Sequence, residues 1–136
     1  MKAGVEKALT GIRATFAGKA IQVVESPCGG AHVLIESVDL GAPFAQSDTW
    51  LGFFLNNACP DADLYPLYVR GDLVRADGAK LEPPLHVNQS WPPTNVAGIP
   101  VRNAVMVSRR QKNSASIGRE TPVIKLLTIL KWMKSQ

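Results

Sequence analysis

Hydrophobic residues recur at helical spacing close to the start of the chain. Four of them are separated by four, three and four positions, and so fall on one face of a helix: Val5, Leu9, Ile12 and Phe16. Gly4 and Gly11 lie in the same stretch and lower its intrinsic helix propensity. The pattern therefore predicts an amphipathic helix over about residues 3–17 that depends on packing for its stability.

A second helical pattern closes the chain. Thr121 can cap a helix with its side-chain oxygen, and Pro122 suits the first helical position because its missing donor is not needed there. An apolar stripe follows, with polar residues between its members: Val123, Leu126, Leu127, Leu130 and Met133. We expect a helix from Thr121 to the C-terminus.

Short apolar segments with strand character lie between the two helices. Residues 20–25 and 31–36 flank a turn of Ser-Pro-Cys-Gly-Gly, which predicts a hairpin. Residues 50–56 form a third strand, and residues 67–70 are a candidate fourth. The order of elements predicts an α+β domain built on a meander of strands.

The segment from 81 to 100 breaks this regular pattern. It holds five prolines, at positions 83, 84, 92, 93 and 100, so we expect it to be extended and irregular. A crossing of this length in a small domain is either functional or an insertion. The apolar run Ala104–Val107 follows and ends in Ser108, Arg109 and Arg110.

Composition places the chain among ordinary globular proteins. Its 136 residues are 46% hydrophobic and 19% charged, which fits one domain over residues 1–136. The first residues lack the apolar core of a signal peptide, and no apolar run reaches membrane-spanning length. We expect a cytoplasmic protein with no membrane partner. Cys28 and Cys59 match neither zinc nor redox spacing, so we expect free thiols and no metal.

Basic charge is concentrated in the last third of the chain. Residues 1–83 carry a charge of −3, whereas residues 84–136 carry +7. Five basic residues and no acidic one fall between Arg102 and Arg119. Such a strip can attract an acidic protein surface or nucleic acid, or it can be a solvated loop. Nucleic acid is the less favoured partner because no recognition helix or aromatic platform accompanies the charge.

Several short motifs occur in a set order along the chain. Tyr65-Pro66 follows the third strand, the tripeptide at 86–88 is His-Val-Asn, and Trp91-Pro92-Pro93 comes soon after it. Ser108 opens a Ser-Arg-Arg segment and stands thirteen positions before Thr121. This order resembles the prokaryotic branch of the ubiquitin-conjugating-enzyme superfamily, which has a Tyr-Pro pair after the third strand, a His-Pro-Asn tripeptide, and a similar spacing between the catalytic residue and the closing helix. Bacterial relatives associated with conjugation operons carry a comparable Ser-Arg-Arg or Ser-Arg-His segment.

The resemblance implies a fold and an activity. The fold is an N-terminal helix, a four-stranded antiparallel meander, an irregular active-site crossing and a C-terminal helix. The activity is that of a carrier, which accepts the C-terminal acyl group of a ubiquitin-like protein from an activating enzyme and transfers it to a protein target. No cofactor is implied, because the nucleotide chemistry belongs to the activating enzyme. The basic strip would then dock acidic partner surfaces or the cargo's tail.

The nucleophile departs from the family pattern. Conjugating enzymes hold their cargo on cysteine, whereas the resemblance places Ser108 at that position. A serine is a weak nucleophile and needs a base, for which His86 is the available imidazole. Four further residues are candidates to stabilise the oxyanion: Asn88, Asn103, Arg109 and Arg110.

Other interpretations remain open on the sequence alone. Ser108 can instead end a strand and hydrogen-bond the backbone, in an inactive scaffold that only binds a ubiquitin-like protein or activating enzyme. Cys59 becomes the nucleophile if the alignment of motifs is shifted, and Ser114 and Ser116 are weaker rivals in the same loop. A basic nucleic-acid-binding domain is the third class.

Overall fold

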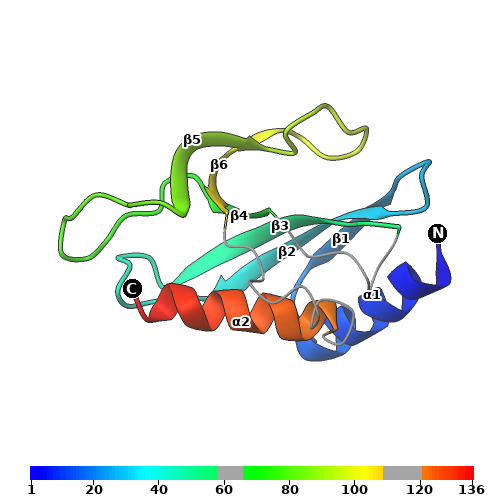
Figure 1. Ribbon diagram of the computed structural model, residues 1–136, viewed down its shortest axis with the longest axis horizontal. Coiled ribbons are helices and arrows are strands. Elements are labelled where there is room, and N and C mark those ends of the chain that lie inside the picture. Colours follow the sequence, from blue (N-terminus) through cyan, green and yellow to red (C-terminus); the bar gives the residue numbers. More distant parts are fainter. Residues whose placement is uncertain (58–65, 109–120) are drawn as a thin grey trace.

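The structure is a computed structural model that describes residues 1–57, 66–108 and 121–136. Within those residues the chain forms two helices and six strands (Figure 1). In chain order they are α1 (Ala3–Thr15), β1 (Ile21–Glu25), β2 (Ala31–Asp39), β3 (Asp48–Leu55), β4 (Leu67–Arg70), β5 (Leu85–Trp91), β6 (Arg102–Val107) and α2 (Pro122–Lys134). The predicted α+β class is confirmed.

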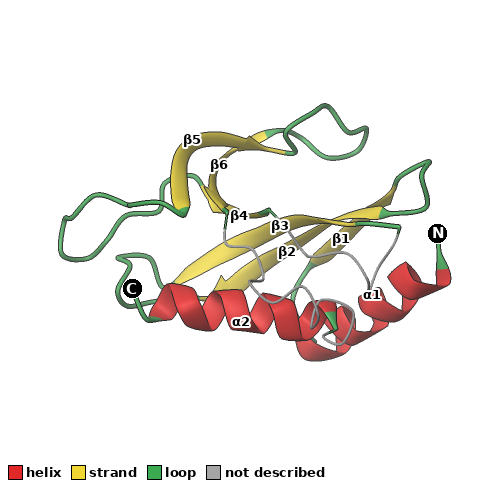
Figure 2. Ribbon diagram, viewed as in Figure 1, coloured by secondary structure: helices red, strands yellow, loops and turns green. Residues whose placement is uncertain are grey.

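The described strands form one antiparallel sheet in the order β1-β2-β3-β4-β6-β5 (Figure 2). The first four strands lie at the predicted positions. The expectation of a four-stranded sheet is wrong, because β6 pairs with β4 and β5 then pairs with β6. The run Ala104–Val107 is therefore an inner strand, and the crossing contributes an edge strand.

The crossing is more regular than its proline content indicated. Its prolines at positions 83, 84, 92 and 93 lie just outside β5, and none lies between Leu85 and Trp91. A proline at the end of an edge strand removes no ladder hydrogen bond. The expectation of an irregular segment over residues 81–100 is therefore corrected for Leu85–Trp91.

Both helices cover the same face of the sheet, while the β5–β6 pair rises on the other side (Figure 1). The core under the helices contains the predicted apolar face of α1 together with inward residues of every strand except β1, whose Ile21 and Val23 are partly buried. Helix α2 begins as predicted: the Thr121 hydroxyl accepts a hydrogen bond from the amide of Ile124 at 3.2 Å. Neither described helix is long and apolar enough to span a bilayer.

The apolar stripe of α2 is rotated from the predicted one. Leu126, Leu130 and Met133 are buried as expected, and Ile129 joins them. Leu127 instead leaves 44% of its surface exposed, as Ile124 does with 47%. The helix therefore buries one stripe against the sheet and keeps two large aliphatic side chains outside the core.

The β5–β6 pair curls across the outer face of the sheet and makes a second, smaller core. Trp91 is 1% exposed and packs directly on the backbone of Gly52 in β3, with Leu34, Tyr68, Ile99 and Ala104 around it. At the tip of the pair, the side-chain amide of Gln22 donates to the carbonyl of Gly98 at 2.7 Å. The β5–β6 pair therefore covers part of the outer face of the sheet, opposite the helices.

The packing of Trp91 on Gly52 gives a test of this arrangement. A Cβ atom at position 52 would lie 2.6 Å from the indole of Trp91, so Gly52→Ala must displace the ring. We predict a loss of about 1–3 kcal/mol in the free energy of unfolding, measured by urea denaturation. Ser90→Ala, at the exposed position next to Trp91, is the control and should change it by less than about 0.5 kcal/mol. Equal midpoints for the two variants would contradict the packing.

Candidate functional site

The pairing of β5 with β6 brings His86 and Ser108 together from positions 22 residues apart. His86 is opposite Met106 in the ladder, and Ser108 lies two residues beyond Met106. Side chains two apart along a strand share a face, so His86 and Ser108 are diagonal neighbours on the same face. Leu85 and Val107, which alternate with them, are buried under the helices, so His86 and Ser108 point to the outer face.

The two side chains are in hydrogen-bond contact. Nε2 of His86 lies 2.7 Å from Oγ of Ser108, and both side chains are half-buried. The carbonyl of Pro84 accepts the amide of Ser108 at 2.8 Å and lies 3.2 Å from its Oγ. The backbone hydrogen bond therefore fixes Ser108. Its hydroxyl has two acceptors within reach, Nε2 of His86 and the carbonyl of Pro84.

The tautomer of His86 decides to which acceptor the Ser108 hydroxyl donates its hydrogen bond. Ser108 Oγ carries one proton, which goes either to Nε2 or to the carbonyl of Pro84. When Nε2 is unprotonated, the hydroxyl donates to it, and the pair has the geometry of a nucleophile and its general base. When Nε2 carries a proton, it donates to Oγ, and the hydroxyl turns to Pro84 as a structural contact.

A β-bulge lies directly after His86. The register of β5 on β6 shifts between His86 and Gln89, and Asn88 adopts a φ of 60° within the bulge. Asparagine tolerates this left-handed conformation better than other non-glycine residues, and bulges often redirect side chains at sites. Asn88 thus lies two residues from His86 with an exposed side chain, and its backbone shapes the strand that holds the imidazole.

The remaining predicted site residues fall in different places. Asn103 lies on β6 five residues before Ser108, about 16 Å away along an extended strand, and faces the opposite side. The structure therefore separates Asn103 from Ser108. Arg109 and Arg110 lie outside the described residues, as do Tyr65, Cys59, Ser114 and Ser116. Of the predicted set, the structure brings together His86 and Ser108, with Asn88 nearby.

Cys28 lies at a different part of the sheet, in the turn between β1 and β2. It is exposed, and its Sγ lies 3.2 Å from the hydroxyl of Ser26. This contact is the main reason that the pKa of the Cys28 thiol is lowered. The basic strip begins with Arg102, which is not free: it pairs with Glu36 at 3.1 Å and lies over the ring of Trp50.

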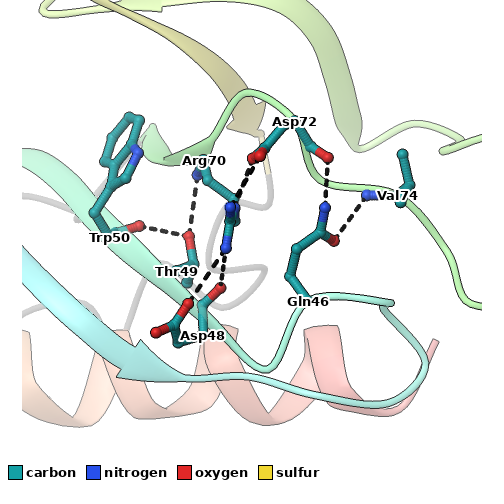
Figure 3. A network of polar contacts seen from close by, with 7 residues as sticks. All are labelled: Gln46, Asp48, Thr49, Trp50, Arg70, Asp72 and Val74. Atoms are coloured by element: carbon teal, nitrogen blue, oxygen red, sulfur yellow. Dashed lines mark hydrogen bonds and ion pairs between the residues drawn. The ribbon is translucent and has the colours of Figure 1, made fainter.

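A second polar cluster, not predicted from the sequence, is centred on Arg70 at the end of β4. Its guanidinium makes a two-pronged contact with Asp72 at 2.6 and 2.9 Å and reaches Asp48 at 3.2 Å (Figure 3). Thr49, 2% exposed, accepts the amide of Arg70 and donates to the carbonyl of Trp50. The available signal was an arginine at a strand end with an aspartate two residues later.

This cluster borders a cavity of about 450 Å³ whose lining includes Glu36, Trp50 and Asn103. The hydrogen bond from Arg70 lowers the pKa of Asp72, so both groups are charged partners of each other. We interpret the cluster as a tie between the start of β3 and the end of β4. Among the described residues, no group of three histidine, cysteine or acidic side chains could hold a metal ion.

Comparison with known proteins returned no family model, no curated protein and no solved structure that matches the chain.

The bulge gives a test that needs no assay of activity. Asn88→Gly introduces a residue that adopts positive φ freely, whereas Asn88→Val places a β-branched side chain in a backbone conformation that it disfavours. We predict that Asn88→Val is less stable than Asn88→Gly by about 1–2 kcal/mol in urea denaturation. Equal stabilities would contradict the positive φ at position 88.

The Arg70 cluster predicts a pH effect on the acid side. Because the pKa of Asp72 is lowered in the folded protein, its ionised form stabilises the fold above the unfolded value near 4, and this contribution disappears as the pH falls through the folded pKa. Its side chain is 66% exposed, so the effect is at most about 1 kcal/mol. An NMR titration of the Asp72 carboxyl carbon should show a low pKa that rises in Arg70→Gln. An unchanged pKa would contradict the contact.

Proposed function

We propose that this protein is a ubiquitin-conjugating-like carrier that holds the acyl group of a ubiquitin-like protein as an oxyester on Ser108. The observation that supports this most is the 2.7 Å contact between Nε2 of His86 and Oγ of Ser108. A weak oxygen nucleophile requires a base within hydrogen-bond reach, and His86 has that position on the neighbouring strand.

The order of elements is compatible with a conjugating-enzyme fold. Helix α1 is followed by strands β1 to β4 as sequential neighbours, and α2 closes the chain. The β5–β6 pair extends the expected four strands, and it is this pair that carries His86 and Ser108. In this proposal the extra strands replace the irregular active-site crossing of the family as the support for the nucleophile.

The proposed reaction is a transfer of an acyl group in two steps. Oγ of Ser108 attacks the thioester carbon of the cargo held on the activating enzyme, while Nε2 of His86 takes the hydroxyl proton. The oxyanion collapses, the carbon–sulfur bond breaks, and the proton returns to the leaving thiolate. An amine or hydroxyl of the target then attacks the ester, which releases the acyl group and restores Ser108.

The oxyanion needs hydrogen-bond donors near Ser108. Asn103 is too far along β6 to act there, which leaves Asn88, Arg109 and Arg110 of the predicted donors. Removing one effective donor costs about 3 kcal/mol in the barrier. Among the described residues, Nδ1 of His86 has no hydrogen-bond partner that would orient the ring.

A catalytically inactive scaffold is the second candidate function. It is favoured by the carbonyl of Pro84, which accepts the amide of Ser108 and lies within reach of its hydroxyl. This double contact is what a serine that merely ends a strand would make. In that case the domain binds a ubiquitin-like protein or an activating enzyme without accepting its acyl group.

The test of the carrier proposal is adduct formation when the protein is incubated with its cognate activating enzyme, ATP and ubiquitin-like protein. We predict a covalent adduct that survives reductant, is cleaved by mild base and is absent in Ser108→Ala. Ser108→Cys should form an adduct that reductant now cleaves, and Ser90→Ala, on the adjacent strand, should behave as the wild type. An adduct that persists in Ser108→Ala would contradict the proposal, and binding without any adduct would favour the scaffold.

The role of His86 gives a separate prediction. His86→Gln should lower the rate of adduct formation by about 10²–10⁴, because the hydroxyl loses its base. The same change made in Ser108→Cys should have a much smaller effect, since a thiol ionises more readily than a hydroxyl. Single-turnover rates of the four proteins measure both effects. An equal loss in the serine and cysteine backgrounds would show that His86 acts only on structure.

A further inference from the structure

An apolar groove separates the start of α1 from the start of α2, on the face of the molecule that the sheet does not cover. Its volume is about 360 Å³, and its lining is Gly4, Lys7, Ala8, Gly11, Thr121, Pro122 and Val123. The small residues Gly4, Ala8 and Gly11 recur every three or four positions, so they form one ridge of α1. Val123 approaches this ridge closely, because a Cβ at Gly11 would lie 3.3 Å from its methyl group.

The apolar surface continues from the groove along α2. Leu127 is one turn after Val123 on the same flank of the helix and is 44% exposed, and Ile124 beside it is 47% exposed. These are among the large hydrophobic side chains that the described structure leaves most exposed. The groove and the two aliphatic residues together form a surface that we call the helical groove.

Among the described residues, the charges around the helical groove are of one sign. Lys7 lines it, and on α2 Lys131 and Lys134 follow Leu127 on the same flank, one and two turns later. Glu6 is the single acidic residue of the two helices. It is turned about 200° from Gly4 around α1, away from the groove.

We infer that the helical groove binds an amphipathic helical segment of a partner protein, with aliphatic residues facing the groove and acidic residues facing Lys7, Lys131 and Lys134. The basic rim requires a partner of opposite charge, which disfavours a second copy of this basic face. Val123 and Lys134 are eleven residues apart, or about 16 Å along the helix, so a matching segment needs about eleven residues. The residues involved do not include His86 or Ser108, so this inference is independent of the proposed acyl transfer.

The experiment is a selection of peptides from a phage library of random 16-residue sequences, with the full chain as bait. We expect selected peptides to carry two aliphatic residues three or four positions apart and at least two net negative charges. Leu127→Asp should weaken their binding at least tenfold, and so should the double variant Lys7→Glu/Lys131→Glu. Val101→Asp changes an exposed valine on the opposite side of the sheet and is the matched control, which should bind as the wild type.

Three results would overturn the inference. The first is a set of selected peptides that depend on Leu127 without being acidic, and the second is acidic peptides that bind Leu127→Asp as well as the wild type. Binding to vesicles of phosphatidylcholine and phosphatidylserine, lost in Leu127→Asp, with no peptide selected, would identify the surface as a membrane contact. Leu127 and the two lysines are exposed, so these variants are expected to fold, and their amide NMR spectra check this.

Discussion

The pairing of β6 with both β4 and β5 is the constraint on which the candidate site depends. Leu67 and Leu85 both align with Val107, one from each side, so the last residue of β6 is held in the middle of three strands. This position fixes the backbone of Ser108, the residue that follows, and the same ladder aligns His86 beside it. Without β5, the serine would have no imidazole within reach.

The end of the β5–β6 pair that holds Trp91 and Arg102 is fixed by the burial of a side chain rather than by sheet hydrogen bonds. Trp91 packs on Gly52, and Arg102 reaches Glu36 on β2, so the pair bends back across the sheet. The fully buried indole contributes several kcal/mol of hydrophobic stabilisation, whereas the half-exposed ion pair contributes about 1 kcal/mol or less. The tryptophan is therefore the main anchor, and a glycine at position 52 provides the space that it needs.

The sequence predicts the parts of the fold that local patterns specify. The face of α1, the Thr121 cap and strands β1 to β4 all follow from spacing and turn residues close in the chain. β5 was missed because its polar residues, from His86 to Ser90, do not resemble a buried strand, and because prolines surround it. The exposure of Leu127 was not predicted, because the apolar residues of α2 cover so wide a part of the helix that either edge of the stripe can face the core.

The candidate site was predictable in its members but not in its geometry. Ser108 and His86 were both identified from the resemblance, yet their contact depends on the register of β5 on β6, which a bulge at Asn88 alters. Asn103 is the opposite case. It belongs to the predicted site and is close to Ser108 in the sequence, but strand alternation turns its side chain to the other face. In the Arg70 cluster only the Arg70–Asp72 contact has a local signal, because Asp48 and Thr49 are more than twenty positions away in the sequence.

Activation of Ser108 by His86 is measured most directly by labelling with a fluorophosphonate, which reacts with activated serine hydroxyls and requires no partner protein. We predict a single adduct on Ser108, located by mass spectrometry of the digested protein, and a labelling rate about 100-fold lower in His86→Gln. A Ser108 that stays unlabelled, or that reacts equally fast in both proteins, would contradict it.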